Sequence, residues 1–340
     1  MLSLLGSIYG KIANVRNDLY TRGIFEMHDL GSRTISIGNI TTGGTGKTPL
    51  VARVAEILAA RGEKVCILTR GYGRENPKKR VLVSDGDQVL ADASQAGDEP
   101  FELAQKLLGK AIVIADADRV AAADWAKRKF GITAFVLDDG FQHRKAKRDV
   151  DIVCIDATDS FGGAKMLPAG RLREPIGNLK RADIVVLTRS DMVDSISDLK
   201  FQISTLNPGA KIFTAKNRVV RVTDISEFYK EMPVVGLGID QIAAIDSLAF
   251  CALGNPDSFY GLLGNVKLSV VATQSFRDHH AYTQADVQNI EGLAGNKNAE
   301  ILITTAKDAV KLADLKFEMP VYVVEIEIEL DDEAAFAALL

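Results

Sequence analysis

The stretch Gly43-Gly44-Thr45-Gly46-Lys47-Thr48 follows an apolar run, Thr34 to Ile40, and precedes a segment with helical periodicity. It therefore lies at a predicted strand-to-helix turn. Glycines allow backbone N–H groups to turn inward around phosphate oxygens, Lys47 places a charge near the β- and γ-phosphates, and Thr48 offers a hydroxyl to Mg²⁺. These residues predict a nucleoside triphosphate site in a protein that transfers or hydrolyses a phosphate.

One position departs from the phosphate-loop pattern G-x-x-x-x-G-K-[ST], because Thr41 stands where the pattern has glycine. The residues downstream nevertheless favour a phosphate loop. Pro49 suits the first turn of a helix and Gly62 suits its end, and apolar residues recur between them at helical spacing: Leu50, Val51, Val54, Ile57 and Leu58. The alternative is an ordinary glycine-rich turn, which leaves Lys47 and Thr48 unexplained.

The composition is that of a globular protein. A chain of 340 residues is long enough for two domains, and its 47% hydrophobic and 25% charged residues are ordinary for a soluble protein. A formal net charge of −4 gives no sign of nucleic-acid binding. The cysteines, at positions 66, 154 and 251, lie mostly within apolar runs, which favours core positions in a reducing compartment over disulfides or a metal cluster.

The first 22 residues predict an amphipathic helix. Leu5, Ile8, Tyr9, Ile12, Val15 and Leu19 follow helical spacing, and Lys11, Arg16 and Arg22 offer cations to anionic headgroups. Such a helix suits a membrane interface, but the same periodicity suits packing against the core, and the pattern leaves both open. We expect neither a transmembrane span nor a cleavable signal peptide.

Apolar strand-like runs alternate with amphipathic segments along the chain, an order that predicts a mostly parallel sheet with helices on both faces. The expected strands are Arg33 to Ile40, Lys64 to Leu68, Ala111 to Ala115, Ala134 to Leu137, Asp151 to Ile155 and Ile184 to Leu187. We expect a phosphate-loop core over 23–210, a strand-like hinge over 211–235, and a smaller α/β lobe over 236–340. In that lobe the expected strands are Ser247 to Leu253, Lys267 to Ala272, Ile301 to Thr304 and Val321 to Ile328.

Carboxylates follow one of these strands at the edge where the phosphate loop opens. Asp138 and Asp139 come directly after Phe135-Val136-Leu137, the position of a Walker B metal partner, although paired aspartates there also suit a cap. Asp138 is the candidate for Mg²⁺. Asp98 and Glu99 precede a helical run, and taken alone they are more typical of helix-start acids.

Two further loops carry polar side chains. His279 and His280 follow a strand of the second lobe, where a histidine suits either a general base or a plain surface turn. Arg171 and Arg173 lie in a loop between Pro168 and Pro175, and arginine forks suit the phosphates of nucleotide or substrate.

Taken together and in order, these motifs resemble the tetraacyldisaccharide 4′-kinase family. The resemblance runs nearly end to end and rests on eight segments: Gly38-Asn39-Ile40-Thr41-Thr42-Gly43-Gly44-Thr45-Gly46-Lys47-Thr48-Pro49, Arg70-Gly71-Tyr72-Gly73-Arg74, Gly97-Asp98-Glu99-Pro100, Asp138-Asp139-Gly140-Phe141-Gln142-His143, Leu167 to Pro175, Gly254-Asn255-Pro256, Asp278-His279-His280 and Thr304-Thr305-Ala306-Lys307-Asp308. The phosphate loop of that family begins with a small hydroxyl residue or similar, so Thr41 is no departure. Ala306 is one, since a charged residue is expected there.

The resemblance implies transfer of the γ-phosphate of ATP to the 4′-hydroxyl of a tetraacylated glucosamine disaccharide 1-phosphate, giving lipid IVA in lipid A biosynthesis. It implies ATP and Mg²⁺ as cofactors, a peripheral location on the cytoplasmic face of the bacterial inner membrane, and no protein partner. The N-terminal helix would then seat the enzyme on the bilayer.

The family also implies roles for single residues. Residues 41–48 would bind ATP; Thr48, Glu99 and Asp138 would surround Mg²⁺; and Lys47 would neutralise the transferred phosphoryl. Asp98 and His279 would form an acid-base pair, with Asp139 as a further catalytic residue. The expected substrate-binding residues are Asn39, Arg74, Arg171 and Arg173.

Two alternatives stay open on the residues alone. A nucleotide-dependent switch or metallochaperone would carry a lysine where this chain has Thr42, and a GTP-binding one would carry Asn-Lys-x-Asp where this chain has Thr188-Arg189-Ser190-Asp191. A soluble phosphate-loop kinase acting on a small molecule would need neither the N-terminal helix nor the arginine loop.

Overall fold

The computed structural model describes residues 2–229, 236, 238–278 and 280–340. The chain divides into two compact units, one running up to Lys216 and resuming over Ile328–Leu340, the other spanning Asn217–Glu327. Strand β8 (Lys211–Asp224) leads out of the first unit, and strand β12 (Val321–Leu330) leads back into it. This division differs from the expected one at its end. The smaller lobe was expected to run to residue 340, but the last residues belong to the first unit.

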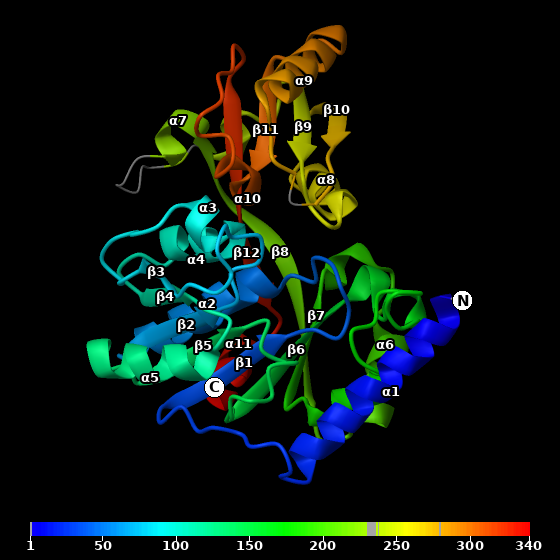
Figure 1. The fold of residues 1–340 in the computed structure, drawn as a ribbon. Helices are drawn as coiled ribbons and strands as arrows, with labels where there is room; N and C mark the ends of the chain where they lie inside the picture. The colour runs from blue at the N-terminus through cyan, green and yellow to red at the C-terminus, as the bar shows by residue number, and fades with distance from the viewer. Residues whose placement is uncertain (1, 230–235, 237, 279) are drawn as a thin grey trace. The chain divides into compact units, whose positions relative to one another are not determined.

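The first unit is built on a mostly parallel sheet, so the predicted fold class is confirmed (Figure 1). Its strand order is β3-β4-β2-β5-β1-β6-β7-β8, and only β3 runs antiparallel to its neighbour. The strands not yet given are β1 (Arg33–Gly38), β2 (Val65–Thr69), β3 (Val81–Ser84), β4 (Ala111–Ala115), β5 (Ala134–Asp138), β6 (Val150–Asp156) and β7 (Ile184–Thr188). The carboxyl ends of the parallel strands meet at one edge, where ligands bind in such sheets.

Helices cover both faces of this sheet. The alternation of side chains along β5 shows why: Val136 packs into the cluster formed with α2 and α4, whereas Phe135 and Leu137 pack into the cluster formed with α5. The helices of this unit are α1 (Leu2–Thr21), α2 (Lys47–Ala60), α3 (Ala93–Ala96), α4 (Asp98–Lys106), α5 (Arg119–Phe130), α6 (Ser197–Leu206) and α11 (Glu333–Leu339), with 3₁₀ turns at Ala157–Asp159, Gly162–Ala164, Ile176–Arg181 and Ser190–Met192.

The second unit repeats this architecture on a smaller scale. Its strand order is β10-β9-β11-β12-β8, with β9 (Ser247–Cys251) parallel to both β10 (Val270–Ser275) and β11 (Ile301–Thr305). Along β9, Ala249 packs with α8 on one face and Phe250 packs with α9 on the other. The helices are α7 (Ile225–Phe228), α8 (Pro256–Asn265), α9 (Gln284–Asn296) and α10 (Ala306–Ala309), with a 3₁₀ turn at Ile239–Gln241.

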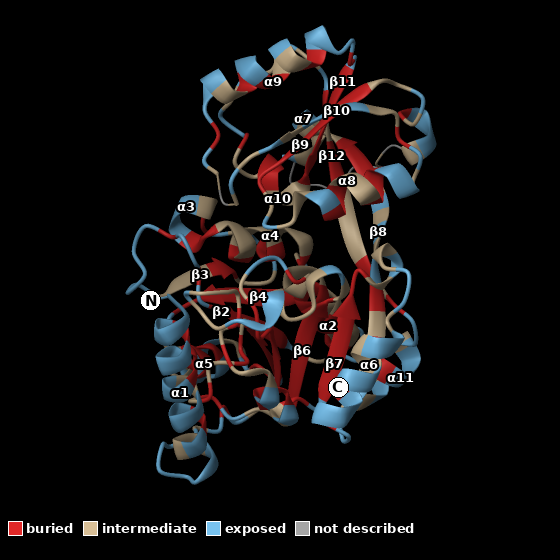
Figure 2. Cartoon of the chain, turned by 90° about the vertical axis from the view of Figure 1, so that its right-hand side faces the viewer, coloured by how far each residue is buried: buried red, intermediate tan, exposed pale blue. Residues whose placement is uncertain are grey.

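Helix α1 packs through its small residues and leaves its apolar residues exposed (Figure 2). Gly6 and Gly10 are buried against Met166, where a Cβ would meet the Met166 carbonyl oxygen at 3.0 Å and its Cγ at 3.3 Å. Seven large apolar side chains of α1 are between 40% and 66% exposed: Leu2, Leu4, Leu5, Ile8, Tyr9, Ile12 and Val15. Among the described residues, no helix has the length and apolar character needed to cross a membrane.

Candidate active site

The phosphate loop connects β1 to α2. Gly46, at φ 74°, is the N-cap of α2 and supplies no side chain to bond the first N–H groups of the helix. A helix start without a side-chain cap attracts anions through its free N–H groups and its dipole. Inside the loop the Asn39 amide donates to Thr45 Oγ1 at 3.0 Å, and Thr188 Oγ1 donates to the Thr45 carbonyl oxygen at 3.0 Å. Hydrogen bonds from Asn39 and Thr188 therefore fix the loop, and the N-terminus of α2 has N–H groups that can bind an anion.

Arg171 holds the phosphate loop at Thr42. Its Nε and Nη2 donate to the Thr42 carbonyl oxygen at 3.1 and 2.8 Å, and its Nη1 pairs with Asp159. The Thr42 N–H in turn donates to the Arg171 carbonyl oxygen at 2.7 Å. The sequence predicts a substrate contact for Arg171. In the structure two of its guanidinium nitrogens hold the phosphate loop and the third pairs with Asp159.

Two consecutive aspartates at the end of β5 lie in opposite electrostatic environments. Asp138 is buried and accepts one hydrogen bond, from Thr69 Oγ1 at 2.9 Å. Burial, together with the negative charges of Glu99 and Asp139, raises the pKa of Asp138 to about 7. The Asp138 carboxylate therefore lacks a cation that would compensate its charge fully.

Asp139 turns away from the strand at φ 51° and is well compensated. Arg173 donates to both of its carboxylate oxygens, at 2.6 and 2.9 Å, and Lys47 Nζ lies 3.9 Å from Oδ1. Burial alone would raise the pKa of Asp139, but the hydrogen bonds and charge of Arg173, with the charge of Lys47, outweigh burial and hold it at about 2. Arg173 also donates to Asn39 Oδ1 at 3.0 Å, so one guanidinium links β5 to the phosphate loop.

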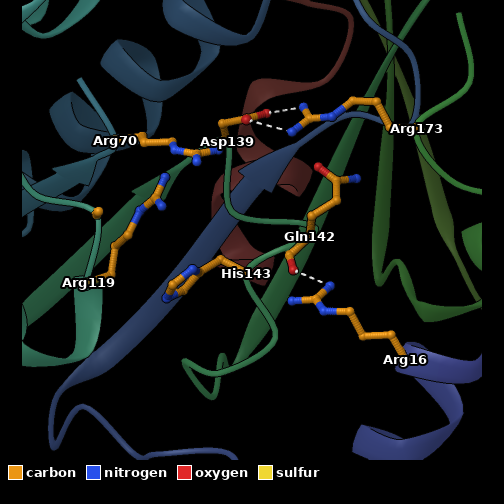
Figure 3. A pocket seen from close by; sticks show the side chains of 8 residues that line it. Arg16, Arg70, Arg119, Asp139, Gln142, His143 and Arg173 are labelled. Atoms are coloured by element: carbon orange, nitrogen blue, oxygen red, sulfur yellow. Dashed lines mark hydrogen bonds and ion pairs between the residues drawn. The ribbon is translucent and has the colours of Figure 1, made fainter. Parts of the chain in front are cut away.

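A pocket of about 260 Å³ opens beside Asp139 (Figure 3). Four arginines and one carboxylate line it, which makes it strongly cationic; its full lining is Arg16, Arg70, Ala117, Arg119, Asp139, Gln142, His143 and Arg173. Burial, followed by the charges of Arg119 and Arg148, lowers the pKa of His143 to about 4, so this ring is neutral at pH 7. Among the described residues, none hydrogen-bonds or ion-pairs with Arg70. The pocket suits an anionic group such as a phosphate.

The whole chain, residues 1–340, matches the family model of LpxK, tetraacyldisaccharide-1-P 4′-kinase. The chain belongs to this kinase family. Relatives named tetraacyldisaccharide 4′-kinase include one from Halothermothrix orenii, 38% identical over 100% of this chain and 91% of the relative, and one from Geobacter metallireducens, 36% identical over 98% and 94%. A crystal structure of LpxK from Aquifex aeolicus, described as an "apo" form in complex with ATP, has a TM-score of 0.77 and 30% identity and covers 98% of this chain and 96% of its own.

Membership makes the chain an ATP-dependent kinase of lipid A biosynthesis. The family and activity that the sequence motifs indicate are thereby confirmed. The two alternatives, a switch or metallochaperone and a soluble small-molecule kinase, are set aside by the same finding.

Within the kinase, Arg74 lies outside the pocket although the sequence predicts a substrate contact for it. Arg74 is buried, and its two Nη groups donate to the carbonyl oxygens of Ala115 at 2.6 Å and Pro77 at 2.7 Å. It fastens the loop after β2 at the edge of the sheet. Asp98 and Glu99 occupy the first turn of α4, where Gly97 packs so closely that a Cβ would meet the Tyr72 carbonyl oxygen at 2.6 Å.

Some residues that line the pocket lie within the sequence motifs but were not predicted to bind a ligand. Gln142 and His143 belong to the segment that begins with Asp138, and Arg70 directly follows strand β2, so their positions after strands were the available signal. Arg119 starts α5, and Arg16 lies on α1. The sequence identifies Arg16 only as a cation for membrane headgroups, because a basic residue on an amphipathic helix is typical of a solvated or headgroup-facing position.

In the second unit, His279 lies outside the described residues, and its predicted role stays a prediction. Its neighbours are well held: Asp278 pairs with Lys307 at 3.1 Å, and His280 Nε2 lies 3.2 Å from Asp286 Oδ2. The segment Thr304-Thr305-Ala306-Lys307-Asp308 supports this loop. Asp308 is fully buried and accepts hydrogen bonds from Tyr282 Oη at 3.1 Å, from Thr305 Oγ1 at 2.6 Å and from the Ala252 N–H at 3.0 Å.

The contact between Arg171 and the phosphate loop predicts different effects for two adjacent glycines. Gly43 has φ 104°, and an added Cβ would collide with the Arg171 guanidinium, so Gly43→Ala is expected to lower the free energy of unfolding by about 1–3 kcal/mol. Gly44→Ala is the control, because its Cβ meets only Arg189 Nη2, at 4.0 Å. Its effect should stay within about 0.5 kcal/mol. Denaturant unfolding without nucleotide measures both variants. Equal free energies of unfolding for Gly43→Ala and Gly44→Ala would show that the contact between Arg171 and the loop is not rigid.

Proposed function

We propose that the arginine-lined pocket binds the phosphorylated sugar headgroup of the acceptor lipid while the phosphate loop holds ATP. The observation that carries this proposal is the position of the pocket: Asp139 lines it and lies within ion-pairing distance of Lys47 in the loop. A single carboxylate thus separates the two sites. The reaction is transfer of the γ-phosphate of ATP to the 4′-hydroxyl of a tetraacyldisaccharide 1-phosphate.

The residues of the first unit fit a Mg²⁺ ion beside the nucleotide. Asp138 is a buried carboxylate whose pKa is raised to about 7 by burial and by neighbouring negative charge, and a divalent cation would relieve both causes. Among the described residues, no group of three or more His, Cys, Asp or Glu side chains is arranged to hold a metal. That suits Mg²⁺, which takes one or two carboxylates along with water and phosphate oxygens. Asp138, Glu99 and Thr48 would hold it, and it would neutralise charge on the phosphates.

For the proton of the 4′-hydroxyl, we assign the base to His279, with Asp98 as its predicted carboxylate partner. This pair is the one that the family resemblance implies, and the contacts of two neighbouring candidates are compatible with it. With its pKa held at about 2 by the hydrogen bonds and charge of Arg173 against the effect of burial, Asp139 is too weak a base to accept a proton near neutral pH. His280 contacts Asp286 and stacks on Phe276 at 4.8 Å. Asp139 is better suited to orienting Lys47 and Arg173.

The pocket assignment is tested with Arg70→Gln. Since no described side chain pairs with Arg70, its charge is available to the acceptor, and we expect KM for the 1-phosphorylated acceptor to rise about tenfold or more with little change in KM for ATP. Radiolabelled transfer from ATP in mixed micelles measures this. On an acceptor without the 1-phosphate, the variant and the parent protein should have similar KM values. Arg128→Gln is the control, because Arg128 is exposed and its ion pair among the described residues is with Asp124 on its own helix. An equal loss on both acceptors would refute the headgroup assignment.

The base assignment is tested with His279→Ala. Removing a general base is expected to lower kcat by about 10²–10⁴-fold while KM for ATP changes little. Steady-state kinetics with saturating lipid acceptor separate the two parameters. Near-normal turnover would move the base to another residue, and the same assay on His280→Ala would then decide whether it is the neighbouring histidine.

We also propose that α1 seats the kinase on the membrane, at the cytoplasmic face of the inner membrane. The sequence left two interpretations open, and the burial of Gly6, Gly10 and Asn17 supports a combination of them: one face packs on the core while the apolar face stays exposed. An exposed apolar helix face beside basic residues is typical of interfacial binding. The acyl chains of the acceptor would then remain in the bilayer while its headgroup enters the pocket.

Replacing Ile8 and Ile12 together by glutamate is expected to reduce partitioning onto vesicles by at least tenfold, because both side chains are exposed on the apolar face. Sedimentation with phosphatidylethanolamine and phosphatidylglycerol vesicles measures the bound fraction. Ser3→Glu with Ser7→Glu adds the same charge to the same helix at polar positions and serves as the control. Equal partitioning of the two double variants would show that the apolar face does not enter the interface.

A further inference from the structure

Helix α1 is docked through a buried hydrogen bond. Asn17 is 5% exposed, and its Nδ2 donates to Glu174 Oε2 at 2.7 Å, while Glu174 itself is 3% exposed. The Asn17 carbonyl oxygen accepts from Arg144 Nη1 at 2.6 Å. A buried polar group is costly unless it is hydrogen-bonded, so these contacts favour a single placement of the helix.

Glu174 connects this helix to the pocket and the phosphate loop. Besides the bond from Asn17, its carboxylate accepts from Arg181 Nη2 at 2.7 Å and from Gln142 Nε2 at 2.9 Å. Gln142 lines the pocket, and its Nε2 also donates to the Asn39 carbonyl oxygen at 2.8 Å. A continuous set of hydrogen bonds therefore runs from α1 through Glu174 and Gln142 to Asn39, which lies between β1 and the phosphate loop.

The residue before Asn17 reaches the pocket directly. Arg16 lies on the same turn of α1, lines the pocket, and donates from Nη1 to the Gln142 carbonyl oxygen at 3.1 Å (Figure 3). Its guanidinium carbon also lies 5.4 Å from the centre of the Tyr20 ring. These contacts leave part of the guanidinium facing the cavity. Arg16 can keep this place only while α1 keeps its position.

We propose that Asn17 is a positioning residue that, through Glu174, holds α1 so that Arg16 forms part of the acceptor site. The inference rests on the proposed function of the pocket and adds one element to it. The helix that carries the exposed apolar face also supplies a cation to the headgroup site. Membrane seating and acceptor binding therefore depend on the placement of one helix.

The test compares four variants in the mixed-micelle transfer assay: Arg16→Gln, Asn17→Leu, the double variant, and Asn14→Leu. We expect Arg16→Gln and Asn17→Leu each to raise KM for the 1-phosphorylated acceptor about tenfold and to leave KM for ATP unchanged. The double variant should lose no more than either single one, because Asn17 acts through Arg16. Asn14→Leu is the control. It removes the other amide contact of α1, Asn178 Nδ2 to Asn14 Oδ1 at 3.1 Å, but touches neither Glu174 nor the pocket, so its KM values should match those of the parent protein.

Other outcomes overturn the inference. Additive losses in the double variant, or an equal loss in Asn14→Leu, would show that Asn17 supports the fold in general and does not act through Arg16. Arg16→Gln removes only an exposed head group and keeps the fold, so an unchanged KM in that variant rejects the inference even where Asn17→Leu fails to fold. Failure of the proposed function would be seen separately. In that case Arg70→Gln would raise KM equally for acceptors with and without the 1-phosphate, whatever the α1 variants do.

Discussion

The ion pair between Arg173 and Asp139 joins the parts of the active site. Asp139 directly follows the central strand β5, Arg173 comes from the loop after β6, and Asn39 follows β1 just before the phosphate loop. The Arg173 guanidinium contacts both of the others. Lys47 Nζ lies 3.9 Å from Oδ1 of the same Asp139 carboxylate. Without Asp139, two cations would face each other across the loop at partly buried positions, which is unfavourable unless an anion compensates them. The arrangement keeps Lys47 in place before ATP arrives.

The contrast between Asp138 and Asp139 follows from the pleat of β5. The last residue of the strand, Asp138, stays with the buried side chains of the sheet, and only Thr69 donates to it among the contacts of the described residues. Asp139 adopts a positive φ, leaves the strand direction and meets two cations. The charge of Asp138 is thus not fully compensated, which suits a metal ligand, whereas Asp139 is paired with Arg173 and Lys47. Residue type alone does not distinguish these roles, because both depend on a single turn of the backbone.

The sequence predicted most of the fold where the pattern was local. Strand β4 has the bounds expected from its apolar run, and α5 is one of the amphipathic segments expected between the strands, with Asp118 as its N-cap. Strand β3 was missed because it is four residues long and half-exposed at an antiparallel edge. Strand β8 was expected only as part of a strand-like hinge over 211–235, because exposed charged residues interrupt its apolar pattern, whereas it is one strand of 14 residues. Long-range contacts were beyond the sequence: Arg171 and Arg74 bond to carbonyl oxygens of distant segments, and no local pattern identifies such partners.

Helix α1 shows how one element satisfies two opposed requirements. An interfacial helix must keep its apolar side chains exposed, yet a helix with an exposed apolar face gains little from packing on its own protein. In this kinase, close approach at Gly6 and Gly10 and a buried amide at Asn17 fix the helix without using its large apolar residues. Hydrogen bonds are directional whereas apolar contacts are not, so this docking specifies rotation about the helix axis. Rotation is the variable that keeps Arg16 at the pocket while Ile8 and Ile12 remain exposed.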